Sequence, residues 1–312
     1  MRHFLMSRRM FLEAASAPLS LCVFDPFLSS FPQTSDFERF AELRTNLLEM
    51  VNEERAVAKV PLLAIDELAT RVATNHAVEM ATHEFASHWG RDGFKPYHRY
   101  SFAGGTAATQ ENVSAADNTW SSKMSDLKQD TSYLHLRLYQ ETPPNDGHRK
   151  AILAPQHTHV GFGIAVEKLR LRMVELFVAK YVEVKDISRV AKPGSQVMFA
   201  GKMLKRDYAL NSIEVFYEPL PKTPELSWLR EARSYGLPDE SKVLRPKVMP
   251  PLMYTDRTQG DIDVEPDGSF SVPITLFDDK PGIYTIVAWI RRGSAKAFPA
   301  TEVCIQTGDI AR

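Results

Sequence analysis

The stretch NDGHRKAILAPQHTHVGFGIAV, residues 145–166, contains the change of periodicity that decides the fold of the first half of the chain. After Gly147 it carries about two turns of helical pattern, which stop before Pro155. Residues 159–167 and 171–184 then alternate or run apolar and are rich in β-branched side chains. We expect a short helix followed by a hairpin of two strands.

Two further helices are predicted upstream of this stretch. In residues 35–60 the apolar side chains recur at three- and four-residue intervals. Residues 64–85 show the same spacing after Asp66, which could cap the helix. Helices therefore accompany the hairpin, and we expect residues 35–187 to form one α+β domain. A chain of 312 residues has room for a second module.

The composition changes beyond about residue 188. Short strand-like runs are separated by proline and glycine, with tight turns expected at Asp267-Gly268 and Pro281-Gly282. This pattern predicts an all-β, immunoglobulin-like sandwich over residues 188–312. Within it, LSWLREARSYG, residues 226–236, predicts a short helix on a connection.

The first 34 residues have the pattern of an export signal. A basic start that includes Arg8 and Arg9 precedes a short apolar run, and the segment Ser7 to Leu12 resembles a twin-arginine signal. The apolar run is too short to span a bilayer, so no integral membrane domain is expected. We predict export to the periplasm or the extracellular space. Removal of the segment would leave Cys304 as the only cysteine and exclude an internal disulfide.

The formal net charge of −1 argues against two classes of partner. A nucleic-acid footprint or a polybasic membrane surface needs an excess of lysine and arginine, which this chain lacks. Recognition is therefore expected at a local site.

A zinc-protease motif is suggested and then excluded by spacing. His83 and His88 flank a glutamate, as in a zinc-binding helix, but they are five residues apart instead of four. Five residues turn a helix by about 140° from the starting side chain, so the two imidazoles would diverge. We expect the remaining histidines, apart from those of the motifs below, to be packed or surface residues.

Three separated motifs together resemble the bacterial branch of the CAP superfamily, the cysteine-rich secretory, antigen 5 and pathogenesis-related-like proteins with an SCP domain. They are FASHWGRDGFKPYHRY at 85–100, GGTAATQENV at 104–113, and the stretch at 145–166. They occur in the family's order within residues 40–185, about half of the chain. The resemblance implies an α-β-α sandwich with a central, largely antiparallel sheet.

The resemblance also implies a polar cleft. Its two family histidines fall on His88 and His148, and its first glutamate falls on Glu111, although Gln110 stands where the family usually has glycine. Glutamine resists backbone conformations that glycine permits, so the local backbone is in question. For the second glutamate we choose Glu141, seven residues before His148, across a pair of prolines.

A cluster of two imidazoles and one or two carboxylates suits three different roles. His88 and His148 could hold a divalent metal such as zinc, the carboxylates could tune a histidine for acid-base work, or the groups could form a structural network. Ser87 adjoins His88, but adjacency does not make a catalytic dyad. Whether the protein is an enzyme therefore stays open.

We favour an exported binding or interaction protein that requires no cofactor. The resemblance suggests an extracellular ligand, either a lipid, a polysaccharide or a protein, without choosing among them. The alternative is a metal-dependent hydrolase, a peptidase or esterase, that uses the same cleft. Two neighbouring side chains also have open roles. Arg149 could bind a cleft carboxylate or face solvent, and Trp89 could stack on a sugar or cap its loop.

Overall fold

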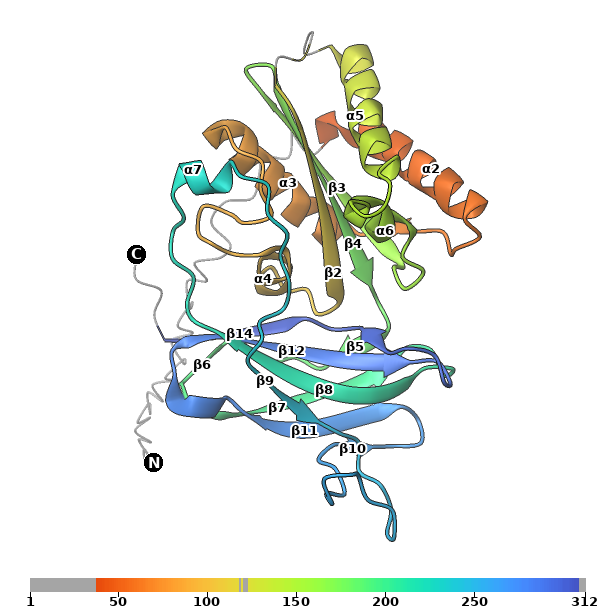
Figure 1. Ribbon diagram of the computed structural model, residues 1–312, viewed down its shortest axis with the longest axis vertical. Helices are drawn as coiled ribbons and strands as arrows, with labels where there is room; N and C mark the ends of the chain where they lie inside the picture. Colours follow the sequence, from red (N-terminus) through yellow and green to blue (C-terminus); the bar gives the residue numbers. More distant parts are fainter. Residues whose placement is uncertain (1–37, 118, 120–122, 309–312) are drawn as a thin grey trace, which may run out of the picture.

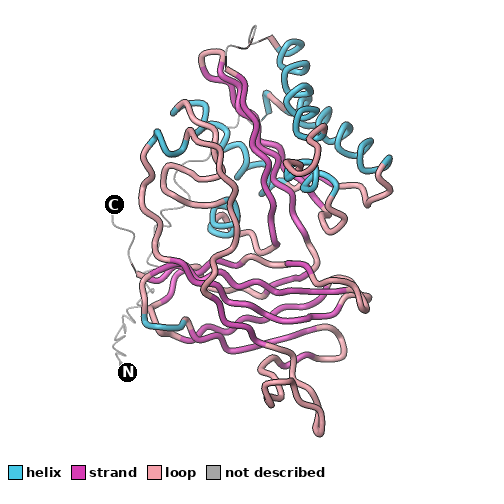
Figure 2. The backbone as a smooth tube through the Cα atoms, in the orientation of Figure 1, coloured by secondary structure: helices cyan, strands magenta, loops and turns pink. Residues whose placement is uncertain are grey.

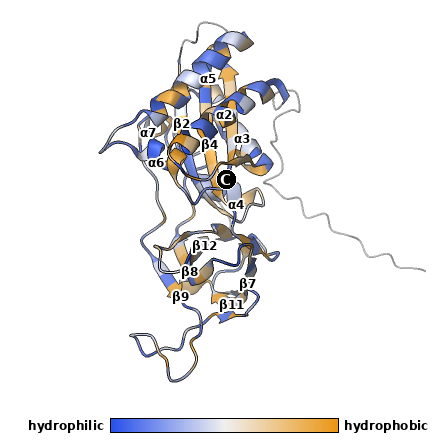
Figure 3. Ribbon diagram, turned by 90° about the vertical axis from the view of Figure 1, so that its right-hand side faces the viewer, coloured by the Kyte–Doolittle hydropathy of each residue, from blue (hydrophilic) through white to orange (hydrophobic). Residues whose placement is uncertain are grey.

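The computed structural model describes residues 38–117, 119 and 123–308. A helix-covered sheet and a pair of further sheets are stacked along the long axis of the molecule (Figure 1). Seen from the side, hydrophobic residues concentrate on the strands and the helices present hydrophilic residues outward (Figure 3). The predicted export signal, residues 1–34, lies outside the described residues.

The first sheet has the strand order β1-β3-β4-β2, and its β1–β3 pair is parallel while the other pairs are antiparallel. The predicted hairpin is confirmed as β3 paired with β4. The strands are β1 (Ala64–Ile65), β2 (Ala108–Ala116), β3 (His159–Glu167) and β4 (Arg170–Ala179). Strand β2 is an edge of this sheet, so one side of its backbone is open to neighbours other than a strand.

Helices cover both faces of this sheet. The helices are α2 (Ala41–Val57), α3 (Glu67–His83), α4 (Pro96–Phe102), α5 (Met124–Tyr139) and α6 (Gly147–Leu153). Helices α2, α5 and α6 share one buried cluster with Phe162 and Ile164 of β3. Helices α3 and α4 share another with Val174 and Leu176 of β4. The α+β class predicted for this half is confirmed, because burial of both faces requires helices on each side of the sheet.

The glycines of the VGFG segment allow α3 to lie directly on β3. A Cβ atom added at Gly161 would lie 2.2 Å from the backbone nitrogen of Thr70, and one added at Gly163 would lie 2.1 Å from the backbone of Ala73. Helix α3 begins at the predicted cap, where the Asp66 carboxylate accepts the Ala69 N–H at 2.6 Å. The loop after α3 reaches β2, where His88 contacts Glu111.

The second half contains two largely antiparallel sheets, with the orders β10-β11-β7-β5 and β6-β14-β12-β8-β9, and β13 also pairs with β12. One buried cluster draws side chains from both sheets, among them Phe199, Val272, Tyr284 and Ile286. The elements are β5 (Val182–Val184), β6 (Val190–Ala191), β7 (Gln196–Met203), β8 (Ala209–Glu218), α7 (Leu226–Leu229), β9 (Ser241–Leu244), β10 (Asp263–Val264), β11 (Ser269–Thr275), η2 (Phe277–Asp279), β12 (Gly282–Arg291), β13 (Phe298–Pro299) and β14 (Val303–Thr307). Strand β5 pairs with β7 although it precedes residue 188. The immunoglobulin-like assignment and the boundary at 188 stay predictions.

The two halves are joined by more than the chain itself. Residues 219–240, which we call the connecting segment, leave β8, return to the first half and include α7, the short helix predicted for this segment (Figure 2). Leu229 of this segment is fully buried in the cluster of α3 and α4. Thr301 also forms an antiparallel bridge with Ala107, just before β2. The second half thus contacts the first at the edge strand β2.

Candidate functional site

A cavity of about 820 Å³ lies along the edge strand β2 and is bounded by both halves of the molecule. Its lining includes residues 86–88, 108–113 and 232–237, together with residues near 141–148, 156–157, 299 and 302. All four predicted cleft residues, His88, Glu111, Glu141 and His148, line this one cavity. A volume of this size is typical of a small-molecule site.

Glu111 is the buried centre of the first polar group. The His88 Nδ1–H donates to its Oε1 at 3.0 Å, and Arg99 donates to its Oε2 at 2.7 Å. The Glu111 side chain is only 1% exposed. Burial alone would raise the pKa of Glu111, but the Arg99 guanidinium and the His88 hydrogen bond lower it below its usual value. Glu111 is therefore an ionised carboxylate held between two donors.

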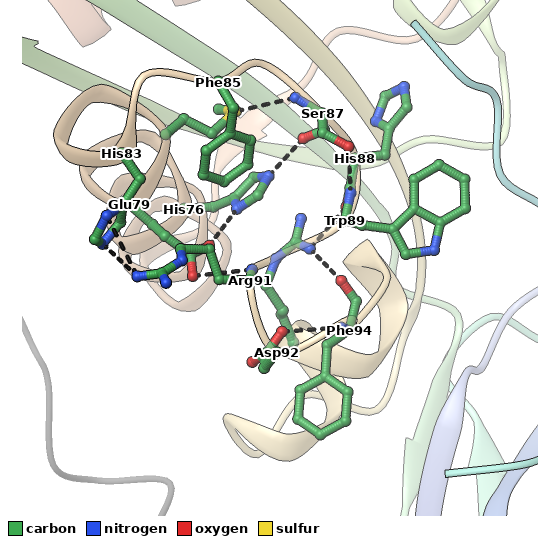
Figure 4. Close-up of polar contacts among 12 residues, drawn as sticks. His76, Glu79, His83, Phe85, Ser87, His88, Trp89, Arg91, Asp92 and Phe94 are labelled. Carbon is green, nitrogen blue, oxygen red and sulfur yellow. Dashed lines mark hydrogen bonds and ion pairs between the residues drawn. The ribbon is translucent and has the colours of Figure 1, made fainter. Parts of the chain in front are cut away.

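The loop that carries His88 is fixed from several sides. The buried His76 of α3 donates from Nε2 to the Ser87 carbonyl at 2.7 Å, and Arg99 donates to the carbonyls of His88 and Phe94, each at 2.8 Å. Figure 4 shows His76 pointing from α3 toward Ser87 while His88 points away from it. Helix α3 ends at His83, and the His83 ring contacts Arg91. His83 and His88 thus have different partners, as their spacing predicts.

His148 and Glu141 form the second polar group. The His148 Nδ1–H donates to Glu141 Oε1 at 2.5 Å, and the His148 backbone N–H donates to Oε2 at 3.1 Å. Both side chains are partly exposed, 34% for His148 and 24% for Glu141. The choice of Glu141 as a neighbour of His148 therefore agrees with the geometry.

A buried ion cluster lies behind this second group. His135 of α5 donates hydrogen bonds to the carboxylates of Glu175 at 2.6 Å and Glu54 at 3.0 Å. Asn112 donates to Glu175 at 3.0 Å and to the His148 carbonyl at 3.2 Å. Burial alone would lower the pKa of His135, but the two carboxylates raise it to about 10. His135 is therefore a buried cation held between two carboxylates.

Two cavity residues from the second half could not be recognised from the family motifs. The Tyr235 hydroxyl accepts the Glu111 backbone N–H at 2.8 Å, and its ring lies 4.8 Å from the His88 ring. The Glu302 carboxylate accepts both the backbone N–H and the hydroxyl of Thr109, at 2.8 and 2.9 Å. Both residues bond to the open edge of β2. For residues 226–236 the sequence predicted only a short helix, so neither residue was expected at the site.

Three local interpretations are resolved by the structure. Gln110 occupies a regular strand position opposite Phe177, so the missing family glycine does not distort β2. Trp89 packs edge-on against Trp228 at 5.2 Å and thus caps its loop. Arg149 donates to the Tyr139 carbonyl at 2.6 Å and lies over the Tyr139 ring, so it neither binds a cleft carboxylate nor simply faces solvent.

The donor set does not fit a catalytic zinc ion. Such ions usually have three protein ligands. His88 and His148 both direct Nδ1 to a carboxylate, as metal-binding histidines commonly do, which leaves Nε2 as the ring nitrogen that could ligate. Within the described residues, however, no group of three or more His, Cys, Asp or Glu is placed to hold a metal, so a third ligand is missing.

A family comparison agrees with the geometry of the first half. The model of the cysteine-rich secretory protein family, CAP, matches residues 48–181. The chain contains a CAP domain. The matched residues include His88, Glu111, Glu141 and His148, so the predicted family resemblance is confirmed. None of the curated proteins compared matches the chain.

Solved structures similar to the CAP domain come from several bacteria. An extracellular protein of Bacillus anthracis with an SCP domain is 23% identical over 48% of this chain and 45% of its own length, with a TM-score of 0.34. An outer surface protein of Borrelia burgdorferi is 16% identical over 48% of this chain and 96% of its own, with a TM-score of 0.34. The CAP domain of enterococcal PrgA is 14% identical over 48% and 72%, with a TM-score of 0.35. The chain thus spans less than half of the Bacillus protein.

Among the described residues, none of the helices combines the length and the apolar character needed to cross a bilayer.

Proposed function

We propose that this protein is exported and binds an extracytoplasmic ligand in the cavity of its CAP domain. The observation that carries the proposal is that His88, Glu111, Glu141 and His148, from three separate segments, line the same cavity of about 820 Å³. The N-terminal pattern of residues 1–34 supports export.

The proposal favours binding over catalysis because the polar groups are engaged with one another. Glu111 is held by His88 and Arg99, and Glu141 receives two hydrogen bonds from His148. These networks orient the two imidazole rings, and among the described residues no hydrogen bond joins either ring to a Ser, Thr or Cys side chain that could act as a nucleophile. The cavity therefore has the character of a preformed binding site.

The test is an NMR titration of the full chain labelled at the histidine Cε1 positions. Three probes are added separately: the neutral trisaccharide cellotriose, the uncharged peptide acetyl-trialanine amide, and dihexanoyl phosphatidylcholine below its micelle concentration. We expect at least one probe to shift the His88 and His148 signals and to leave His83 unchanged. If no probe shifts the two cleft signals, the proposed function is wrong.

A cavity-filling variant tests whether the shifts arise inside the cavity. Gly147 lines the cavity, and a Cβ atom added there meets nothing within 4 Å, so Gly147→Phe adds a ring at a position with room for it. This variant should abolish the shifts, whereas Ala295→Phe, on an exposed turn outside the cavity, should retain them. Shifts that persist in Gly147→Phe would contradict the proposal.

A further inference from the structure

The charges on the cavity wall are compensated within the protein. Glu111 is paired with Arg99 and Arg233 with Glu231, and both carboxylate oxygens of Glu141 accept hydrogen bonds from His148. Neither a lysine nor an aspartate belongs to the described lining. A charged ligand would find no counter-ion on the wall and would lose its hydration on entry. The cavity is therefore suited to an uncharged ligand.

Several lining side chains can both donate and accept hydrogen bonds. They include Ser87, Thr109, Gln110, Asn145, Gln156 and Ser234. The apolar lining consists mainly of alanines, together with Val113, Leu237 and Pro299. An acyl chain needs a continuous wall of larger aliphatic side chains, so this lining disfavours a lipid tail.

The edge of β2 is blocked against an extended peptide. Peptides that add to a sheet edge bond to the outward backbone N–H groups of the edge strand. Here the Thr109 N–H donates to the Glu302 carboxyl group, and the Glu111 N–H donates to the Tyr235 hydroxyl. A peptide strand would have to displace both side chains, which disfavours this mode of recognition.

We propose that the cavity binds an uncharged, hydroxyl-rich ligand of the neutral oligosaccharide class, and that Tyr235 and Glu302 of the second half contact it directly. This inference rests on the proposed function and names its ligand class. Hydroxyl groups are donors and acceptors at once, so they match the amide and hydroxyl side chains that the lining contains. The ring of Tyr235 beside His88 adds a flat surface of the kind on which sugar rings pack.

Glu302 is suited to an uncharged ligand by its surroundings. Glu302 is only 6% exposed. Burial raises the pKa of Glu302 to about 8, although the hydrogen bonds from Thr109 lower that pKa in part. The carboxyl group is therefore mostly neutral at pH 7. Both bonds from Thr109 go to Oε2, so Oε1 is the oxygen available to a ligand hydroxyl.

Tyr235 is positioned by a network that joins the two halves. Lys95 and Tyr97 of the CAP domain contact the carbonyl of Gly236 at 3.5 and 3.3 Å, and both donate to Glu218 of β8. This contact fixes the connecting segment next to Tyr235. Glu218 is thus a positioning residue for the wall that Tyr235 forms.

The experiment is calorimetric titration of the full chain at pH 7 with cellotriose, an acidic trigalacturonate and a cationic glucosamine trisaccharide. We expect cellotriose to bind at least about 10-fold more tightly than either charged sugar. Equal or tighter binding of a charged sugar overturns the inference. Binding of the peptide or phospholipid probe instead of cellotriose also overturns it, while the proposed function would stand.

Variants of Glu302 and Tyr235 distinguish the loss of a ligand contact from a loss of folded structure. Glu302→Gln keeps a neutral group that accepts from Thr109, so cellotriose affinity should stay within about 3-fold, whereas Glu302→Ala and Tyr235→Ala should each lose about 10-fold. Glu240→Gln, an exposed site in the second half, is the matched control and should change nothing. Each variant is compared only after its circular dichroism and melting curve match the wild type. If Tyr235→Ala and Glu302→Ala retain full affinity while Gly147→Phe abolishes it, the contacts proposed for the second half are wrong.

Discussion

The ring of Tyr235 lies 4.8 Å from the ring of His88, and its hydroxyl accepts the backbone N–H of Glu111 at 2.8 Å. The tyrosine belongs to the connecting segment, and the other two residues belong to the CAP domain. The second half of the chain therefore supplies a wall of the cleft, and it has a larger role than that of an appended module.

Loss of the Glu218 carboxylate should loosen the contact between the halves. Glu218 pairs with Lys95 at 2.8 Å and with His98 at 3.0 Å, and its side chain is 18% exposed. Glu218→Gln should lower the free energy of unfolding by about 3 kcal/mol at pH 7, because it leaves partly buried donors without a charged partner. Urea denaturation followed by tryptophan fluorescence measures this change, with Glu240→Gln as the control. A change below about 0.5 kcal/mol would show that the network does not stabilise the protein.

The contribution of Glu218 should also depend on pH in one direction. Burial alone would raise the pKa of Glu218, but His98 and Lys95 lower it to about 2 from a usual value of 4.5. A depressed pKa means that the stabilisation is present above about pH 4.5 and is lost as the pH falls toward 2. The difference between the wild type and Glu218→Gln should therefore shrink over this window. A difference that grows on acidification would contradict the assignment.

His135 should remain protonated in neutral and mildly alkaline solution. Its pKa is raised to about 10 by Glu175 and Glu54 against the effect of burial, so its stabilising contribution is present below about pH 6.5 and is lost as the pH rises through 10. The nitrogen chemical shifts of the imidazole should report a cation at pH 8. Glu175→Gln should cost about 3 to 5 kcal/mol of stability. A neutral imidazole at pH 8 would show that the cluster is not a buried ion network.

Cys304 should be unreactive in the folded protein. The residue is fully buried, and burial raises the pKa of its thiol to about 12. In a Cys22→Ser variant, where Cys304 is the sole thiol, labelling with a thiol reagent at pH 8 should be at least about 100-fold slower in the native state than in urea. Cys304 contacts Ser101 and Tyr97 of the CAP domain. Rapid labelling of the native protein would show that the two halves separate at this contact.

Metal removal should leave the protein intact. Because no third ligand accompanies His88 and His148 among the described residues, a chelator should shift the Tm by less than about 1 °C. A matched titration with zinc of the wild type and His88→Gln checks the same point. A large loss of Tm on chelation, absent in His88→Gln, would favour the metal-dependent hydrolase.

The fold of the CAP domain could be predicted because local signals agreed with one another. The helix before Pro155, the hairpin after it and the Asp66 cap all depend on short-range patterns, and the glycines of β3 mark a close approach of α3. The pairing of His88 with Glu111 followed from the family resemblance. The choice of Glu141 depended on its distance in sequence from His148, and the turn through the prolines brings the two together.

The remaining part of the site could not be predicted for a physical reason. Tyr235 and Glu302 are more than a hundred residues from β2, and they meet it through hydrogen bonds to backbone groups, which leave no pattern in the sequence of β2. Arg99 lies inside the motif at 85–100, but its role depends on the fold of the loop that it anchors. The contacts between the two halves therefore become visible only in the structure.

The most direct test of the account is a crystal structure of the full chain soaked with cellotriose. We predict density for the sugar inside the cavity, between His88 on the CAP side and Glu302 on the other, with a sugar oxygen within hydrogen-bonding distance of the Glu302 carboxyl group. Sugar bound only on an outer surface, or a cavity that stays free of sugar at saturating concentration, would contradict the claim that both halves build one binding site.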